Sequence, residues 1–376
     1  MPRTLIRALA IGLALTLPAQ LAVASGGWVA TGPLSQPRNF IVVVALPEGG
    51  ALAVGGTIQS TIGSTPMVER YDPAAGLWTI TGPMTEPRSR HAAVVLDDGR
   101  VLVAGGRGVN LSLRSAERYD PSTRAWTVTG AMATPRDWHT LTKLADGRVL
   151  AAAGLSLIST NPNNPIEKSA ELYDARSGTW SVTADLRNQR WGHTATLLQD
   201  GRVLVIGGGN PSGECQFVER AELYDPRTGH WSETGGLSNP RGCHDATLLQ
   251  DGRVLVTGGL VHAPGTCQAP TAAAEIYDPA TGTFGSVGPM TFARNGHVAA
   301  RLPDGRVLVA GGRSAGRAWT ASTEIFDPAT KTWSAASPLP FARNARSSAQ
   351  LADGRVMIAG GRDATGITAS VVVYVP

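Results

Sequence analysis

A glycine pair recurs seven times along the chain, and its spacing constrains the fold more than any other feature. The second glycine of a Gly-Gly pair, or of one Ala-Gly variant, recurs every 48 to 54 residues, at Gly56, Gly106, Gly154, Gly208, Gly259, Gly312 and Gly361. An aromatic residue stands 28 positions before each of these glycines, at Trp28, Trp78, Trp126, Trp180, Trp231, Phe284 and Trp333. Self-similarity at a fixed period of this length indicates a repeat protein.

Two charged residues also keep fixed places in the repeat. An arginine follows each aromatic by ten positions, at Arg38, Arg88, Arg136, Arg190, Arg241, Arg294 and Arg343. In six repeats a glutamate precedes the next aromatic by nine positions, at Glu69, Glu117, Glu171, Glu222, Glu275 and Glu324. Val372 takes this place in the last repeat. The shared period predicts buried Arg–Glu pairs, either inside one repeat or between neighbours. The number of residues varies only between the second glycine and the glutamate position.

Composition favours short strands over helices. The 376 residues include 45 glycines and 25 prolines, and few long apolar helical patterns occur. The formal net charge is only +4, and no run of basic residues marks a nucleic-acid interface. We therefore expect no nucleic-acid partner.

Residues 1–24 have the pattern of a secretory signal peptide. Two arginines precede the apolar run 8–17, and Ala22-Val23-Ala24 provides a small-residue cleavage motif. The apolar run is shorter than the roughly 18 residues that a membrane span needs, and no other stretch approaches that length. We expect a secreted or periplasmic protein whose mature part, residues 25–376, forms one domain without a membrane span.

Within each repeat, turn residues separate short strands. Residues 91–96 and 100–104 flank Asp98-Gly99, a pair suited to a two-residue hairpin turn. A third strand ends in Tyr-Asp-Pro, as at residues 71–73, because proline stops ladder pairing. A fourth strand begins at the next repeat tryptophan. Seven such units predict an all-β fold, a seven-bladed β-propeller with four antiparallel strands in each blade.

Two sequence strings carry a family resemblance. PRSRHAAVVLDDGRVLVAGG and AERYDPSTRAW resemble the kelch repeat, and the resemblance covers residues 28–376. It rests on the glycine pair, the tyrosine of the third strand and the tryptophan of the fourth strand, and it implies a kelch β-propeller. The chain ends in a third strand, whereas Trp28 begins a fourth strand with no first three before it. We therefore expect residues 27–32 to complete the last blade and close the ring.

All the variable segments fall on one face of such a propeller. In a four-stranded meander, the loops between strands two and three share a face with the connections between blades. We call this the variable face. Repeat proteins place insertions on their binding face, because loops change there without disturbing the core. Function is therefore expected on the variable face.

Candidate ligand-binding residues lie on that face. Three tryptophans stand outside the repeat positions: Trp138, Trp191 and Trp319. Together with Asp137, they suit sugar rings, which stack on aromatic faces and hydrogen-bond to polar groups. Alternatively, these tryptophans fill gaps between blades. Three arginines follow glycine pairs: Arg107, Arg313 and Arg362. They either form a positive mouth for an acidic ligand or bind backbone carbonyls.

Five histidines follow the repeat arginine by three positions, at His91, His139, His193, His244 and His297. Imidazoles that face a channel bind metals or move protons. However, a residue that recurs blade after blade usually serves the blade, and five scattered equivalents do not form a compact three- or four-ligand site. We therefore predict a structural role and neither metal nor other cofactor.

The three cysteines leave a disulfide open. Cys215 and Cys267 occupy equivalent places in neighbouring variable loops, and an oxidising compartment permits a bridge between them. This pairing is favoured, although Cys243 is also able to pair with either partner.

Two functions follow from these features. Galactose oxidase resembles this architecture, but its copper centre uses tyrosines, and all six tyrosines here are repeat tyrosines. Secreted sialic acid epimerases are also similar, with Arg, Glu and His at the mouth, but no such trio stands out from the repeat here. The sequence favours a monomeric, non-catalytic module that binds a glycan or a protein. The alternative is a carbohydrate-active enzyme, of epimerase or oxidase type, with its site at the channel mouth.

Overall fold

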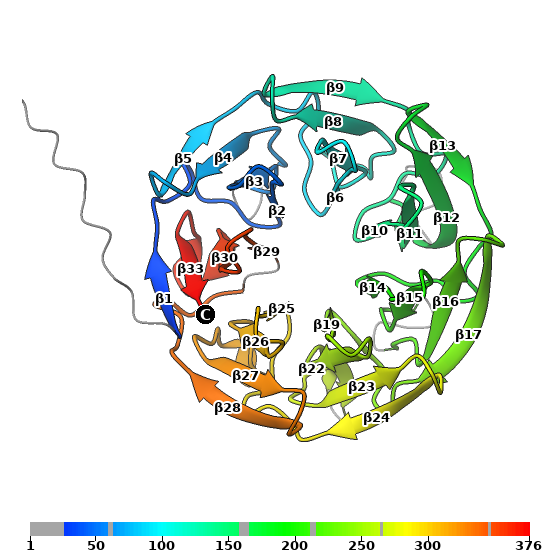
Figure 1. The fold of residues 1–376 in the computed structure, drawn as a ribbon, viewed down its shortest axis with the longest axis vertical. Coiled ribbons are helices and arrows are strands. Elements are labelled where there is room, and N and C mark those ends of the chain that lie inside the picture. The colour runs from blue at the N-terminus through cyan, green and yellow to red at the C-terminus, as the bar shows by residue number, and fades with distance from the viewer. Residues whose placement is uncertain (1–25, 59–62, 158–164, 211–215, 264–265, 345–346) are drawn as a thin grey trace, which may run out of the picture.

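Seven four-stranded antiparallel sheets stand side by side around a central axis (Figure 1). This computed structural model describes residues 26–376, except 59–62, 158–164, 211–215, 264–265 and 345–346, and leaves the side chains of Thr266, Cys267 and Arg317 undescribed. Each sheet is one blade, with its first strand near the axis and its fourth at the rim. The predicted all-β propeller is confirmed.

The first three blades follow one another along the chain. Blade 1 contains β2 (Val42–Ala45), β3 (Ala51–Val54), β4 (Val68–Asp72) and β5 (Leu77–Ile80). Blade 2 contains β6 (Ala92–Val95), β7 (Val101–Ala104), β8 (Ala116–Asp120) and β9 (Ala125–Thr129). Blade 3 contains β10 (Thr140–Lys143), β11 (Val149–Leu155), β12 (Ile166–Asp174) and β13 (Thr179–Val182).

The next three blades repeat this order. Blade 4 contains β14 (Thr194–Leu197), β15 (Val203–Ile206), β16 (Arg220–Asp225) and β17 (His230–Gly236). Blade 5 contains β19 (Asp245–Leu248), β20 (Val254–Thr257), β23 (Ala274–Asp278) and β24 (Thr283–Val287). Blade 6 contains β25 (Val298–Arg301), β26 (Val307–Ala310), β27 (Thr323–Asp327) and β28 (Thr332–Ala336).

The loops of the variable face add short elements to this frame. Blade 5 carries a small sheet of β18 (Arg241–Gly242), β21 (Leu260–Ala263) and β22 (Thr266–Pro270). Blade 6 carries the short 3-10 helix η1 (Ala315–Arg317), and blade 7 carries the pair β31 (Arg362–Asp363) and β32 (Gly366–Ile367). The segments that vary in length therefore decorate one side of a constant frame.

The two ends of the chain complete one blade. Blade 7 contains β29 (Ser348–Gln350), β30 (Val356–Ala359), β33 (Val371–Val375) and, at the rim, β1 (Gly27–Ala30). In the antiparallel register of β1 and β33, Trp28 lies opposite Tyr374. The expected closure by the N-terminal strand is confirmed.

Deleting residues 27–32 is expected to lower the melting temperature, because it uncovers the edge of β33 and removes Trp28 from the core between blades 6 and 7. Differential scanning calorimetry of the chain beginning at residue 26, with and without these six residues, measures the effect. The Trp28→Ala variant, measured separately beside the unchanged chain, shows how much of the decrease comes from the loss of one ring and how much from the loss of the strand. An unchanged melting temperature after the deletion would contradict this closure.

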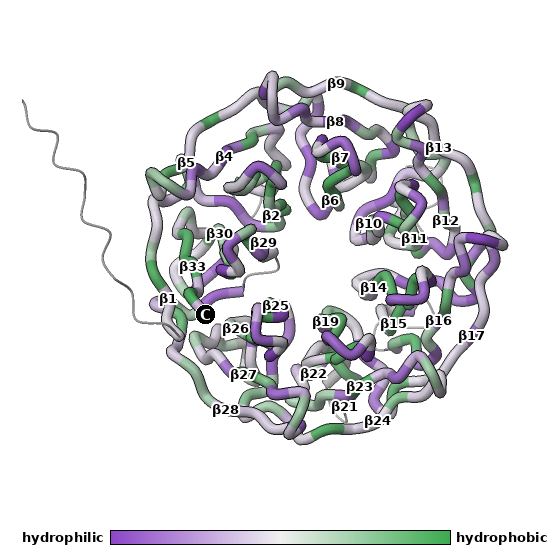
Figure 2. Tube along the Cα trace, viewed as in Figure 1, coloured by the Kyte–Doolittle hydropathy of each residue, from purple (hydrophilic) through white to green (hydrophobic). Residues whose placement is uncertain are grey.

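The hydrophobic core is divided among the interfaces between neighbouring blades. Val44, Leu52 and Val54 of blade 1, for example, pack in one cluster with Val101 and Tyr119 of blade 2. Figure 2 accordingly shows hydrophobic segments in every blade instead of one central core. Each blade is therefore stabilised by both of its neighbours, as the repeat architecture implies.

A buried arginine stands inside each blade. All seven repeat arginines are fully buried, and six of them contact the repeat glutamate of the same blade at 2.5 to 2.8 Å between nitrogen and oxygen. In blade 3, Arg136 also donates to the carbonyl oxygens of Ala153 (3.0 Å) and Ser169 (2.9 Å), while Glu171 accepts the N–H of Ala133 (2.6 Å). The predicted pairs therefore lie inside blades, where they tie the glycine turn, the third strand and the incoming connection together.

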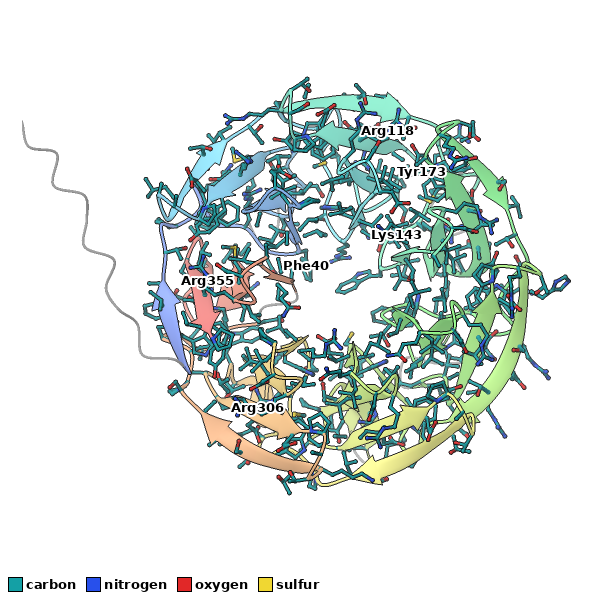
Figure 3. All side chains as sticks on the ribbon, in the orientation of Figure 1. Phe40, Arg118, Lys143, Tyr173, Arg306 and Arg355 are labelled. Carbon is teal, nitrogen blue, oxygen red and sulfur yellow. The ribbon has the colours of Figure 1, made fainter. Side chains whose placement is uncertain are left out.

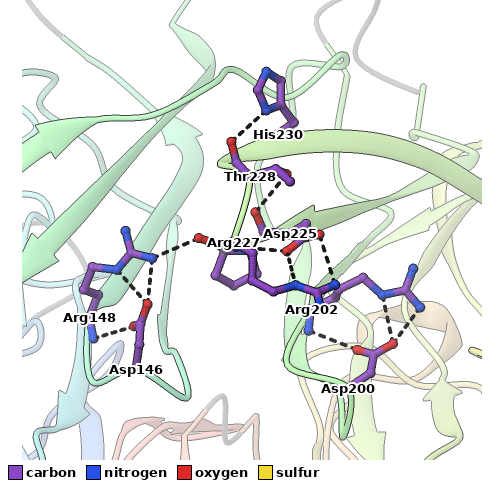
Figure 4. Close-up of polar contacts among 9 residues, drawn as sticks. Asp146, Arg148, Asp200, Arg202, Asp225, Arg227, Thr228 and His230 are labelled. Atoms are coloured by element: carbon purple, nitrogen blue, oxygen red, sulfur yellow. Dashed lines mark hydrogen bonds and ion pairs between the residues drawn. The ribbon is translucent and has the colours of Figure 1, made fainter.

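Aspartates close the hairpin turns between the first two strands of a blade, and Figure 4 shows two of these turns. Asp146 accepts the backbone N–H of Arg148 (3.0 Å) and its guanidinium (2.6 Å), and Asp200 contacts Arg202 at the same two distances. These turns repeat from blade to blade with the same chemistry. They serve the scaffold, so the differences between blades concentrate on the variable face.

Candidate binding site at the mouth of the channel

The glycine pairs let neighbouring blades approach closely near the axis. Gly105 and Gly106 have φ values of 61° and 96°. A Cβ atom on Gly105 would lie 2.5 Å from the carbonyl oxygen of Arg136 and 2.7 Å from Cε1 of His139, both in the next blade. Ala153, the exception to the pattern, keeps the positive φ at 55°. The pairs thus satisfy both a backbone conformation and a contact between blades.

The five repeated histidines are buried between the blades. Burial lowers the pKa of His91 and of His244, and together with the smaller effect of nearby repeat arginines it brings the pKa of each to about 3. Burial also lowers the pKa of His139 and His193 well below 6.5. These four imidazoles are therefore neutral near pH 7. Among the residues that the structure describes, no group of three or more metal-ligating side chains is arranged to hold a metal ion.

The residue two positions after each repeat arginine lies at the mouth of the channel. We call the six described residues at this position the mouth ring: Phe40, Arg90, Trp138, Gly192, Cys243 and Gly296. Each has a φ between 51° and 61°. The backbone N–H of each member from Arg90 to Gly296 donates to the carbonyl oxygen of the preceding member, at 2.9 to 3.4 Å. Main-chain hydrogen bonds thus run from blade to blade around the mouth.

Four members of the mouth ring hold this conformation without being glycine. They are Phe40, Arg90, Trp138 and Cys243. A positive φ costs a residue with a side chain about 1 to 2 kcal/mol, and such strain clusters at functional sites. The protein keeps these four side chains at one repeated position despite the cost of a positive φ, so we take the mouth ring as a candidate functional site.

A cavity of about 330 Å³ opens inside the mouth ring. On one side Phe40, Trp138 and Arg90 pack against one another: the two ring centres are 5.5 Å apart, and the guanidinium carbon of Arg90 lies 5.0 Å from the centre of Phe40 and 5.5 Å from that of Trp138. Phe40 is seen at the edge of the central opening in Figure 3. On the other side, Gly192 and Gly296 leave space. The cavity is therefore bounded by a preassembled aromatic and cationic wall on one side only.

Polar groups complete the lining of the cavity. Asp245 accepts the N–H of Ala246 (2.8 Å) and of Ala299 in the next blade (2.9 Å). Burial raises the pKa of Asp245 to about 6, against the lowering effect of these two donors. At the equivalent position of blade 7, Ser347 accepts the N–H of Val43 through its hydroxyl (2.7 Å). The cavity thus offers apolar faces beside hydrogen-bonding groups.

The structure brings two of the sequence-derived site residues together. Trp138 lines the cavity, and Trp191 packs against it with the ring centres 6.1 Å apart. Asp137, in contrast, is fully buried, and its carboxylate accepts the hydroxyl of Ser112 (2.8 Å). Burial raises the pKa of Asp137. Its described contacts therefore lie inside the protein, next to the mouth ring.

The other sequence-derived residues lie outside the lining of the cavity. Trp319 is in blade 6, where the guanidinium of Arg313 lies 5.6 Å from its ring centre. Arg107 donates to the carbonyl oxygen of Asn110 (3.4 Å), which matches its backbone-binding alternative. Arg362 is exposed and pairs with Asn344 through the backbone. These residues belong to the variable face but not to the cavity.

The disulfide between Cys215 and Cys267 stays a prediction. Cys215 and the side chain of Cys267 fall outside the described residues. The thiol of Cys243 is free and lies at the mouth ring.

Sequence reasoning missed Phe40, Arg90, Cys243 and Asp245. A signal for the first three was present, because the position two residues after the constant repeat arginine changes from Phe to Arg, Trp, Gly and Cys between blades 1 and 5. Such variation at one place in a constant repeat is typical of a residue that serves recognition. Nothing in the sequence distinguished Asp245, since its pKa depends on burial between blades.

Comparison with known families finds kelch repeats in the chain. The kelch motif matches residues 87–133, 190–238 and 294–340. An F-box/kelch-repeat protein of Arabidopsis thaliana is 34% identical over 100 residues, which cover 26% of this chain and 25% of the relative. A kelch repeat-containing protein of Caenorhabditis elegans is 28% identical over 114 residues, covering 29% and 18%. The chain thus spans about a quarter or less of these relatives.

Solved structures share the fold over most of the chain. A fungal alcohol oxidase of the AA5 family, in complex with copper, has a TM-score of 0.74 at 17% identity, over 94% of this chain and 77% of the other. YjhT has a TM-score of 0.62 at 14% identity, over 81% and 98%. At these identities the likeness concerns the fold alone. All six tyrosines here lie on third strands, and none lines the cavity.

Proposed function

We propose that this propeller, which contains kelch repeats, is a secreted module that binds a glycan in the cavity at the mouth of its channel. The observation that carries the proposal is the wall of Phe40, Arg90 and Trp138, held on backbone with positive φ at the rim of the cavity. A site that keeps strained residues in a fixed stack is organised before its ligand arrives, which reduces the entropy lost on binding.

The chemistry of the cavity supports a sugar as the ligand. Sugar rings present apolar C–H faces that pack on aromatic side chains, and their hydroxyls bind to polar groups nearby. The cavity combines Phe40 and Trp138 with the guanidinium of Arg90 and the hydroxyl of Ser347. Its volume of about 330 Å³ is at the small end of the usual range for ligand pockets. One terminal sugar unit fits this space better than a long stretch of chain.

Secretion is part of the proposal and rests on residues 1–24, which lie outside the described residues. Their charged start, apolar run and small-residue motif support export. In the part of the chain that the structure describes, no helix has the length and apolar character needed to cross a membrane.

Binding is tested by isothermal titration with a panel of neutral and acidic sugars, using wild type and Trp138→Ala. The variant is expected to lose at least tenfold in affinity, because an aromatic anchor at the centre of a site is commonly worth 2 kcal/mol or more. Trp319→Ala, which removes a tryptophan of the same face outside the cavity, is the matched control and should bind like wild type. Equal loss in both variants, or no binding of any sugar by wild type, would contradict the proposal and favour a protein partner.

A second candidate is a carbohydrate-active enzyme, favoured by Asp245. A carboxyl group with a pKa of about 6 inside a ligand cavity is suited to move protons near neutral pH. Turnover of a bound sugar, followed by proton NMR and abolished in Asp245→Asn, would establish this candidate. Binding without any turnover leaves the module as proposed.

A further inference from the structure

Aromatic side chains continue from the mouth of the channel across blade 4. Trp138 of the mouth ring packs against Trp191, with the ring centres 6.1 Å apart. Trp191 forms an antiparallel bridge with Gly209, and Gly209 forms a second bridge with Phe217. Residues directly opposite each other in antiparallel strands carry their side chains on the same face. We call the three partly exposed residues Trp138, Trp191 and Phe217 the aromatic track.

Two buried glycines make room for the rings of the aromatic track. A Cβ atom on Gly209 would clash with Nε1 of Trp191 and lie 2.7 Å from Cε2. A Cβ atom on Gly242, in blade 5, would lie 3.0 Å from both Cδ1 and Cε1 of Phe217. Each ring therefore packs directly on main chain at a place where a larger residue would displace it.

The equivalent places in blades 1 and 2 show that the fold does not need these rings. There a serine stands at the position of Phe217 and hydrogen-bonds to the next blade. The hydroxyl of Ser64 donates to that of Ser89 (2.9 Å). The hydroxyl of Ser112 donates to the carboxylate of Asp137 (2.8 Å). A polar pair thus joins neighbouring blades equally well, so the aromatic ring and its glycine partner are particular to blades 4 and 5.

The mouth ring is open toward the aromatic track. Its member in blade 4 is Gly192, which directly follows Trp191 and lines the cavity. The mouth ring therefore contributes no side chain between the cavity and Trp191. A cavity of about 330 Å³ holds a small group. A longer ligand with one end in the cavity has to continue over the variable face, and this opening leads onto the aromatic track.

We infer that the ligand is an oligosaccharide whose terminal unit occupies the cavity and whose next two units lie over Trp191 and Phe217. This inference rests on the proposed function and adds the length and direction of the glycan. Each unit of a sugar chain presents an apolar ring face, which suits a row of aromatic side chains. Asn210 and Gln216 flank the track, joined by a hydrogen bond from the N–H of Asn210 to the carbonyl oxygen of Gln216 (3.0 Å). Their amide side chains donate and accept, as sugar hydroxyls do.

The test measures how affinity depends on the length of the ligand. Titration calorimetry compares the mono-, di- and trisaccharides of glucose, mannose, galactose and galacturonic acid. Wild type is expected to bind the trisaccharide of its preferred series at least tenfold more tightly than the monosaccharide. Phe217→Ala should weaken the trisaccharide about fivefold, the effect of one lost aromatic contact, and leave the monosaccharide unchanged. Phe292→Ala, which removes a phenylalanine of blade 6 with an exposed fraction of 48%, is the matched control and should bind like wild type.

A second variant displaces a ring without removing one. Gly209→Ala places a methyl group where the indole of Trp191 lies, and the φ of Gly209 is outside the left-handed region, so the backbone accepts the change. The gain in affinity from monosaccharide to disaccharide should decrease about fivefold. Urea unfolding of both variants, with a midpoint above the concentration at which binding is measured, shows that each is folded.

The outcomes separate this inference from the proposed function. If a monosaccharide binds and Trp138→Ala weakens it, but longer ligands bind no better, the aromatic track is not a glycan site and the binding module stands. The same conclusion follows if the gain with length is unchanged in Phe217→Ala and Gly209→Ala. If no member of the four series binds to wild type, both proposals are overturned.

Discussion

Glu222→Ala is expected to lower the free energy of unfolding by about 3 to 5 kcal/mol, because it leaves a buried guanidinium without its carboxylate. Glu222 and Arg190 are both buried, with 2.5 Å between Oε1 and Nη2. The carboxylate also accepts the N–H groups of Arg187 (2.7 Å) and Asn188 (3.2 Å), which belong to the connection from blade 3. The loss therefore reaches both the blade and the link to its neighbour.

Two comparisons define this prediction. Glu222→Gln keeps an acceptor oxygen and is expected to cost less than Glu222→Ala in urea unfolding. Blade 7 shows a natural solution, because Arg343 faces Val372 and donates instead to the hydroxyl (2.6 Å) and carbonyl (3.0 Å) of Ser370. Burial there lowers the pKa of Arg343 to about 10, and Asp363 opposes the shift. Blade 4 has Arg220 at the place of Ser370, so no hydroxyl at that position is able to replace the carboxylate of Glu222. An unchanged urea midpoint for Glu222→Ala would therefore mean that water reaches the guanidinium of Arg190.

Acidification is expected to unfold the protein in a narrow range below pH 6. Four buried histidines have pKa values lowered from 6.5: His91, His139, His193 and His244. The unfolded chain binds these protons below pH 6.5, whereas the folded chain resists them until about pH 3 for His91 and His244. Their contribution to stability is therefore complete above pH 6.5 and is lost as the pH falls.

The magnitude follows from the number of protons. Each histidine contributes a slope of about 1.4 kcal/mol per pH unit. Asp245 opposes one of them, because its raised pKa of about 6 lets the folded chain hold a proton that the unfolded chain releases above pH 3.8. A net uptake of about three protons gives roughly 4 kcal/mol per pH unit, so the loss between pH 6.5 and pH 4 is roughly 10 kcal/mol, which is comparable with a typical total stability of about 5 to 15 kcal/mol. Urea unfolding at pH 7, 6, 5 and 4.5 measures the slope.

A variant distinguishes the histidines from other acid-sensitive groups. Replacing His193 with glutamine, which retains a polar side chain able to bond with Thr140, removes one titrating group. The slope between pH 6 and 5 should then fall by about a quarter to a third. A stability that stays constant from pH 7 to 5 in wild type would show that these imidazoles are already charged in the folded protein.

Much of the fold was predictable because the sequence contains the motif of one blade seven times. The glycine pair, the repeat tyrosine and the repeat tryptophan each recur with fixed spacing, and they define the turn and two strands of every blade. The closure by β1 was predictable for the same reason, since the ends of the chain hold complementary parts of one repeat. What the sequence left open was whether arginine and glutamate pair inside or between blades, because a period of one repeat fits both.

The site was less predictable, because it depends on residues brought together across blades. Trp138 and Trp191 stood out as tryptophans beyond the repeat, and they do pack together. Phe40 and Arg90 are ordinary residues for a loop, and their stack with Trp138 depends on the backbone that places three neighbouring blades around one axis.

The backbone hydrogen bonds of the mouth ring separate the architecture of the mouth from its side chains. Main-chain atoms link successive blades there, whether the residue is phenylalanine, arginine, tryptophan, glycine or cysteine. Each blade thus contributes one position to the mouth ring, and the side chain at that position is not needed for the hydrogen bonds between neighbouring blades. Under the proposed binding function, substitutions at this single position in each blade are expected to change ligand preference without disturbing the contacts between blades.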